Sequence, residues 1–203
     1  MTETYTLGLA LYDIVPNVFF IIGALYLMKL LRQECGKACA SLMAAGSALV
    51  LLGGLFKVAW KLLYSTSAID IVLFNEAQFA LSAPGFLAML IAVIAFTRGL
   101  KSRAILPAFI APWKIPLLAV MTLCSLGLQG ILVYVGFRRK ARGAAWAYIV
   151  SVLCMLGMAS MASGEQTVAR QWVEQSINAA GQAAFALGGY LMYRNFETEV
   201  RGD

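Results

Sequence analysis

Long runs of apolar residues dominate this chain, and each run is long enough to cross a lipid bilayer. About 20 residues of α-helix span the roughly 30 Å hydrocarbon core of a membrane. The runs are Leu7–Leu31, Cys39–Leu63, Ala68–Phe96, Ile115–Phe137, Ala144–Ser163 and Val168–Tyr193. With 61% hydrophobic and only 13% charged residues, the chain lacks the charged surface of a soluble domain. We therefore predict an all-α, polytopic transmembrane helical bundle of about six spans, in the bacterial plasma (inner) membrane.

The sequence also resembles itself when it is shifted by about 104 positions. The aligned pairs are Gly23 with Gly127, Gly53 with Gly157, Gln78 with Gln182, and Gly85-Phe86-Leu87 with Gly189-Tyr190-Leu191. We predict a single membrane domain, residues 1–203, built from two three-helix repeats at about 7–97 and about 114–196. Duplicated membrane units often place their binding site at the seam between the copies.

The net charge of +6 comes from Lys and Arg residues that cluster at the ends of the apolar runs. Such residues set topology and contact lipid headgroups, so we expect the lipid bilayer, and no nucleic acid, as a partner. With six alternating spans, each side of the membrane receives eight Lys and Arg residues. Inverted three-helix repeats explain this tie. Alternatively, Ala104–Trp113 crosses or re-enters the membrane as a seventh element, which places the basic loops on one side. We favour the six-span, inverted arrangement.

Polar residues recur every three or four positions in the third and sixth runs, so they share one face of each helix. The binding residues predicted from these stripes are Asn75, Glu76, Gln78 and Ser82 in the third run and Glu174, Asn178 and Gln182 in the sixth. Because polar groups are expensive in lipid, we expect both stripes to point inward, toward each other. The alternative is that these side chains hold neighbouring helices together by hydrogen bonds.

The first run contains two further predicted binding residues, Asp13 and Asn17, which are four positions apart on one helix face. Pro16 lies between them and lacks a backbone donor, so it frees a carbonyl of the preceding turn. The freed backbone could line a cavity together with the two side chains. The alternative is a kinked or capped start of the helix.

Other notable residues are assigned structural roles. Lys57 and Lys61, near the end of the second run, are expected to extend to the lipid headgroups, and the alternative is a role with an anionic ligand. All four tryptophans lie near the ends of runs, where tryptophan anchors a helix at the membrane interface: Trp60, Trp113, Trp146 and Trp172. Cys35 and Cys39 are expected to be free thiols, because a disulfide within one helical turn is geometrically awkward.

The chain contains no histidine. This excludes haem ligation by histidine, zinc–histidine hydrolysis and nucleophilic sites that use histidine as the base. We expect no cofactor and no metal site.

These patterns favour a small permease, or the substrate-binding membrane subunit of one, which holds a small polar or amphipathic solute between the two repeats. The alternatives are a channel, a membrane enzyme that acts on a lipid or isoprenoid with carboxylate acid–base groups, and a non-catalytic sensor or assembly subunit. A homodimer or a partner membrane subunit is compatible with each of these functions.

Overall fold

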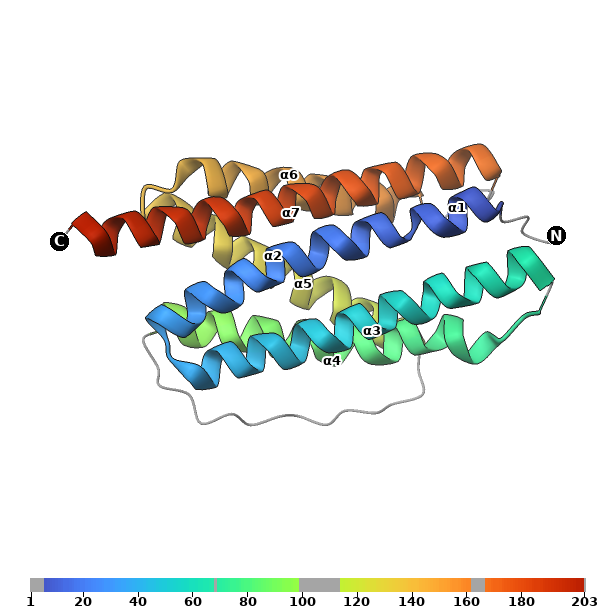
Figure 1. Ribbon diagram of the computed structural model, residues 1–203, viewed down its shortest axis with the longest axis horizontal. Coiled ribbons are helices and arrows are strands. Elements are labelled where there is room, and N and C mark those ends of the chain that lie inside the picture. The colour runs from blue at the N-terminus through green and yellow to red at the C-terminus, as the bar shows by residue number, and fades with distance from the viewer. Residues whose placement is uncertain (1–5, 68, 99–113, 162–166, 203) are drawn as a thin grey trace.

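The computed structural model describes residues 6–67, 69–98, 114–161 and 167–202, and these residues form helices and no strand. The helices are α1 (Leu7–Tyr12), α2 (Ile14–Glu34), α3 (Lys37–Ser67), α4 (Val72–Thr97), α5 (Lys114–Arg138), α6 (Arg142–Met161) and α7 (Val168–Gly202). α1 and α2 form one rod with a break at Asp13, so the bundle is built from six long rods (Figure 1).

Five segments among the described residues are long and apolar enough to cross a membrane. They are Leu7–Glu34, Lys37–Ser67, Val72–Thr97, Leu117–Arg138 and Arg142–Met161. The prediction of a helical membrane bundle is therefore confirmed, and we treat the chain as an integral membrane protein. The sixth predicted span, Val168–Tyr193, lies in α7, which has 35 residues but carries more polar side chains than the other helices.

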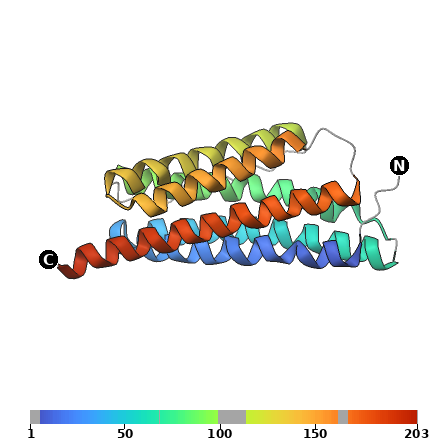
Figure 2. The same ribbon diagram turned by 90° about the horizontal axis from the view of Figure 1, so that it is seen from above.

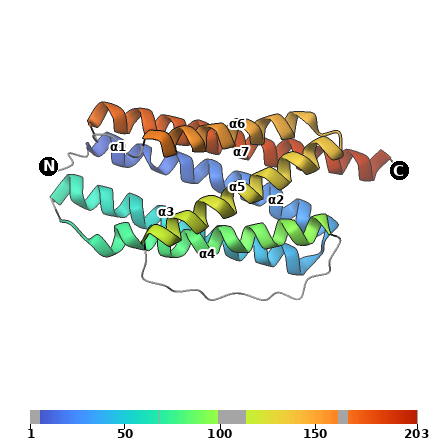
Figure 3. The ribbon, with the colours of Figure 1, turned by 180° about the vertical axis from the view of Figure 1, so that it is seen from behind.

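The long helices form a closed ring, in which each one packs against the next along the chain and α7 packs against α2 (Figures 1 and 2). Ring contacts show that α2 and α7 run parallel. Phe20 contacts Phe185 at 5.9 Å between ring centroids, and one or two turns further on Tyr26 contacts Tyr190 at 5.3 Å. α4 and α5 also run in the same direction, so the end of α4 and the start of α5 lie at opposite ends of the bundle (Figures 1 and 3).

These directions differ from our expectation of inverted repeats. Six spans that simply alternate would make the first and last helices antiparallel, whereas here they are parallel. The groups α2–α4 and α5–α7 consequently run in the same sense (Figure 3). The alternative seventh element, Ala104–Trp113, lies outside the described residues.

With these helix directions, the described Lys and Arg residues are not divided equally between the two ends of the bundle, as the six-span arrangement predicts, but are concentrated at one end. One end of the bundle holds the junctions α2–α3 and α5–α6 and the C-terminal ends of α4 and α7. The described Lys and Arg residues nearest this basic end are Lys29, Arg32, Lys37, Arg98, Arg138, Arg139, Lys140, Arg142, Arg194 and Arg201. The opposite, charge-balanced end has Lys57, Lys61, Lys114 and Arg170 together with the acids Asp13, Asp70, Glu76 and Glu174.

Aromatic rings fill the middle of the bundle. Phe20 of α2 lies between Phe86 of α4, at 6.2 Å, and Phe185 of α7, at 5.9 Å between ring centroids. Phe185 also contacts the buried ring of Tyr148 on α6. The outer faces of α5 and α6 expose large apolar side chains such as Leu123, which is 68% exposed, as expected of helices that face lipid.

A disulfide joins Cys35, at the end of α2, to Cys39, in the first turn of α3. Our expectation of free thiols at these positions was therefore wrong. The two cysteines do not lie within one continuous helix, because the chain turns at Gly36, where φ is +92°. The turn brings their side chains together, and the helical-turn geometry on which we based the expectation does not apply.

Candidate functional site

The break between α1 and α2 interrupts the first rod of the bundle, and it carries a buried carboxylate. Pro16 has no backbone N–H, so the helical hydrogen bond that would tie this turn together is absent. The Asn17 side chain turns back and donates its Nδ2 to the Asp13 carbonyl oxygen at 2.9 Å. The break therefore leaves the Asp13 side chain at a position where two rods of helix meet, and only 5% of that side chain is exposed.

The partner of Asp13 is Lys61 on α3, which forms an ion pair with it. Only 4% of the Lys61 side chain is exposed. We expected Lys61 to extend to the headgroups, and this was wrong. α3 runs antiparallel to α2 and places Lys61 opposite the Asp13 carboxylate, so the ammonium is neutralised inside the bundle and has no need to reach the interface.

Two adjacent glycines of α3 bring three helices together beside this pair. A Cβ atom at Gly54 would collide with the Asn17 side chain of α2. A Cβ atom at Gly53 would lie 2.8 Å from Ser82 Oγ and 2.9 Å from the Gln78 carbonyl oxygen, both on α4. The glycines thus let polar residues of α2 and α4 approach the α3 backbone more closely than any side chain would permit.

Several buried acceptors around this region have no hydrogen-bond donor among the described residues. They are Asp13 Oδ1, Gln78 Oε1 and, at the same end of α7, Gln171 Oε1. Buried polar atoms are nearly always paired in folded proteins. The charge-balanced end of the bundle therefore offers unused acceptors to a group that carries donors.

Trp60 connects the C-terminal end of α3 to the segment that leads to α4. Its indole Nε1 donates to Asp70 Oδ1 at 2.8 Å, and its ring stacks on Tyr64 at 5.9 Å between centroids. The residue is buried, so our assignment of Trp60 as an interface anchor was wrong. Its indole ties the end of α3 to the connection that leads to α4. Trp146 and Trp172 are exposed, as an interface anchor must be.

The polar stripe of α4 lies against α3 and does not face α7. Gln78 and Ser82 contact Gly53, and one turn further Gly85 meets the backbone of Gly46. Asn75 is half-buried, and Glu76 is exposed.

On α7, Asn178 and Gln182 are half-buried on the helix face that also carries Phe185. Glu174 pairs with Arg170, with Oε1 3.4 Å from Nε. The ring of Phe20 lies between the faces of α4 and α7 that carry Phe86 and Phe185. The structure therefore places Asp13 against Lys61, Asn17 against Gly54, and Gln78 and Ser82 against Gly53, all on α3, and shows no contact between the stripes of α4 and α7 among the described residues.

Sequence reasoning did not select two buried polar residues at this end, Lys61 and Gln171. For Lys61 a signal was present. An antiparallel hairpin that turns at Gly36 places residues at similar distances before and after the turn opposite each other, and Asp13 and Lys61 meet this condition. Gln171 continues the α7 stripe by one helical step toward the N-terminus, so the same periodicity would have included it.

Among the described residues, no three Cys, Asp or Glu side chains lie close enough together to hold a metal ion. Comparison of the chain with models of protein families, with curated proteins and with solved structures finds no match.

Proposed function

We propose that this protein is a small permease, or the substrate-binding membrane subunit of one, in the bacterial plasma membrane. The observation that carries the proposal is the buried Asp13–Lys61 ion pair inside two membrane-spanning helices. In the proposed orientation the basic end faces the cytoplasm, because Lys and Arg residues accumulate on that side of membrane proteins. The solute site then lies in the outer half of the bundle, at the charge-balanced end.

The energetics of burial support a functional role for the pair. Removing two charges from water costs several kcal/mol per ion, and apolar residues of similar volume often stabilise a protein as well or better. Ionisable residues within membrane spans accordingly mark substrate and ion pathways by default. A bundle that needed only to pack would not require Asp13 and Lys61.

The unused acceptors indicate the chemistry of the solute. Asp13 Oδ1 and Gln78 Oε1 can accept hydrogen bonds, and Asp13 can exchange the Lys61 ammonium for a cationic group of a ligand. We therefore propose a small polar or amphipathic solute that carries an amine or hydroxyl donors. The α1–α2 break next to Asp13 supplies a hinge at which α1 can move when the ion pair opens.

The arrangement of the rods is compatible with a duplicated permease whose repeats run in the same direction. We propose that residues 7–97 and 114–196 are parallel repeats related by an axis along the membrane normal. α2–α3–α4 and α5–α6–α7 then occupy equivalent halves of the ring, with seams where α4 meets α5 and α7 meets α2. The polar group around α3 lies within the first half and beside the α7–α2 seam.

A second function, a non-catalytic sensor or assembly subunit, is favoured by the packing of the middle of the bundle. Phe20, Phe86 and Phe185 fill the space that a solute would cross, and the α4 stripe is used to pack against α3. In this function the ion pair would hold the bundle in one conformation.

A ligand screen with purified protein, followed by uptake in proteoliposomes, separates the two functions. A panel of amines, amino acids and polyols should contain a compound that raises the melting temperature and accumulates in the vesicles. Gln78→Leu should abolish both effects. Gln129→Leu is the matched control, because Gln129 also has a buried Oε1 without a hydrogen-bond donor among the described residues but lies on α5. A ligand that still stabilises Gln78→Leu and Asp13→Asn as it does the native chain would contradict the proposed site.

A further inference from the structure

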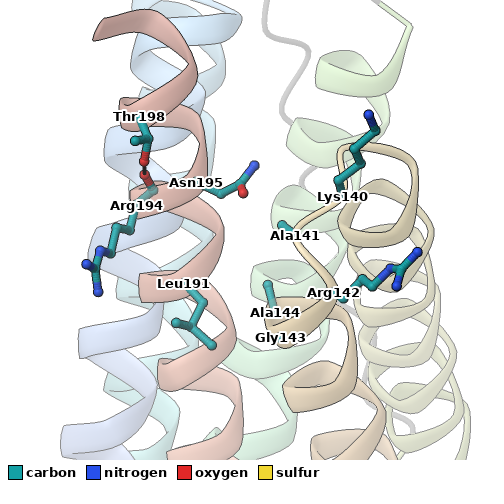
Figure 4. Close-up of a pocket in the computed structure, with 9 residues that line it drawn as sticks. All are labelled: Lys140, Ala141, Arg142, Gly143, Ala144, Leu191, Arg194, Asn195 and Thr198. Carbon is teal, nitrogen blue, oxygen red and sulfur yellow. Dashed lines mark hydrogen bonds between the residues drawn. The ribbon is translucent and has the colours of Figure 1, made fainter. Parts of the chain in front are cut away.

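The basic end of the bundle contains a depression that the proposed permease function does not use. It has a volume of about 380 Å³ and lies between the start of α6 and the C-terminal part of α7 (Figure 4). Its lining residues are Lys140, Ala141, Arg142, Gly143, Ala144, Leu191, Arg194, Asn195 and Thr198. The lining combines small and apolar residues with polar ones and with three cations, Lys140, Arg142 and Arg194, which we call the rim cations.

The three rim cations are available for a ligand. Lys140, Arg142 and Arg194 are exposed, and none of them forms an ion pair with a carboxylate among the described residues. Of the nearby acids, Glu34 and Glu199 both pair with Arg139, and Glu197 of α7 has an interaction of its own. Among the described residues, the three cations therefore have no carboxylate bound to them.

The side chains in Figure 4 extend from two sides of the depression. In the structure the Arg142 and Arg194 side chains turn outward on opposite sides of the gap and Lys140 extends past the α5–α6 turn, while Asn195 points into the space between the helices. Long, exposed and unpaired arginines can fold over an anion at the cost of side-chain entropy alone. Arginine also binds phosphate oxygens through two parallel N–H groups.

The position of the depression favours a lipid over a soluble anion. It lies where the apolar part of α6 begins, and the exposed ring of Trp146, one turn into α6, contacts Phe137 of α5 at 6.2 Å between centroids. Exposed tryptophans of this kind mark the level of the headgroups. Leu191 of α7 and Gly143 of α6 line the depression on its side toward the middle of the bundle, where the acyl chain of a bound lipid would lie.

We propose that this depression binds the phosphate headgroup of an anionic phospholipid, with Lys140, Arg142 and Arg194 holding the phosphate and Leu191 contacting the start of the acyl chain. The site is independent of the solute site, which lies at the opposite end of the bundle.

Native mass spectrometry tests this proposal on the full-length protein in detergent with equal amounts of phosphatidylglycerol and phosphatidylcholine. The native chain should retain phosphatidylglycerol preferentially. The triple variant Lys140→Gln/Arg142→Gln/Arg194→Gln should lose the bound lipid by roughly tenfold or more. The matched control is Arg32→Gln/Lys37→Gln/Arg98→Gln, which removes three exposed cations from the same end but outside the depression. It should retain the lipid.

A further variant, Leu191→Trp, fills the depression without changing the charge, and it should also reduce the bound lipid. Equal losses in the two triple variants would show that only the overall field of the basic end attracts lipid, and would overturn the proposal. Displacement of phosphatidylglycerol by excess inorganic phosphate would show that the free anion is the ligand, and would overturn the assignment to a lipid.

Discussion

The two ends of the bundle both join helices through charged side chains, but they do so in opposite environments. At the charge-balanced end, Asp13 and Lys61 pair with only 4–5% of their side chains exposed. At the basic end, Arg139 lies 3.9 Å from Glu34 and 3.7 Å from Glu199, and between 25 and 47% of each side chain is exposed. Arg139 also lies over the Phe196 ring, at 4.8 Å from its centroid.

This contrast shows that the number of ion pairs at an end of the bundle does not predict how strongly the loss of one charge destabilises the protein. Exposed pairs contribute between zero and about 1 kcal/mol, because water already solvates both partners. A buried pair adds little net stability, yet removal of one partner is costly because the other charge is left without compensation. We therefore expect the two ends to respond very differently to the loss of a single charge.

The largest effect is expected for Lys61→Met. It leaves the buried Asp13 carboxylate unpaired, which should lower the free energy of unfolding by about 3–5 kcal/mol. SDS denaturation of the purified protein in mixed micelles measures this loss. The double variant Asp13→Leu/Lys61→Met should recover most of it, because no charge then remains buried. If the double variant is as unstable as the single one, the loss of stability comes from the packing of these side chains and not from their charge.

Gly54→Ala should have the next largest effect. The new methyl group would collide with the Asn17 side chain, and overpacking of this kind costs about 1–3 kcal/mol. Gly130→Ala on α5 is the matched control, because nothing lies within 4 Å of a Cβ atom there. The control should be neutral or stabilise the helix by up to about 1 kcal/mol through its better helix propensity. Equal melting temperatures for both variants would mean that α2 and α3 are less closely packed at the ion pair than the structure shows.

Trp60→Phe should have a smaller effect at the same end. The substitution keeps most of the buried ring but removes the Nε1 hydrogen bond to Asp70, with an expected cost of about 1 kcal/mol because the carboxylate is partly solvated. Asp70→Asn should lower the melting temperature by a similar amount. Trp146→Phe, at a position that is 61% exposed, should leave it unchanged. A shift for Trp60→Phe no larger than that for Trp146→Phe would show that the hydrogen bond from Trp60 to Asp70 does not stabilise this end of α3.

The sequence sufficed for the class of fold because the thickness of the bilayer fixes how long an apolar helix must be. It did not suffice for the directions of the helices. The direction of α5 depends on whether the connection from α4 crosses the membrane. The length of an apolar run predicts a span only for segments of about 20 residues, so it could not decide this for a segment as short as Ala104–Trp113. Parallel contacts such as Phe20–Phe185 are tertiary and have no counterpart in local periodicity.

Part of the candidate site could have been predicted more closely. The stripe of Gln78 and Ser82 ends in Gly85, and a glycine in a polar stripe indicates close approach of a neighbouring helix as readily as it indicates a cavity. The structure shows that this neighbour is α3. Asp13 was identified because a carboxylate in an apolar run is conspicuous. Lys61 was not, because a lysine near the end of a span is usually solvated at the interface.

The smallest effect is expected for Arg139→Gln at the basic end, and it completes the comparison. Although Arg139 contacts two acids and an aromatic ring, water reaches all the charged partners, so the loss should be within about 1 kcal/mol. What stability Arg139 does provide should weaken as salt rises, because exposed charges are screened. Measuring unfolding of Arg139→Gln and Lys61→Met at low and high salt separates the two cases. The Lys61→Met deficit should persist at high salt, since the unpaired Asp13 carboxylate is beyond the reach of ions. A salt-independent loss of several kcal/mol in Arg139→Gln would show that the contacts of the basic end are as desolvated as the Asp13–Lys61 pair. The exposed fraction of a side chain would then not predict how much its charge contributes to the free energy of unfolding.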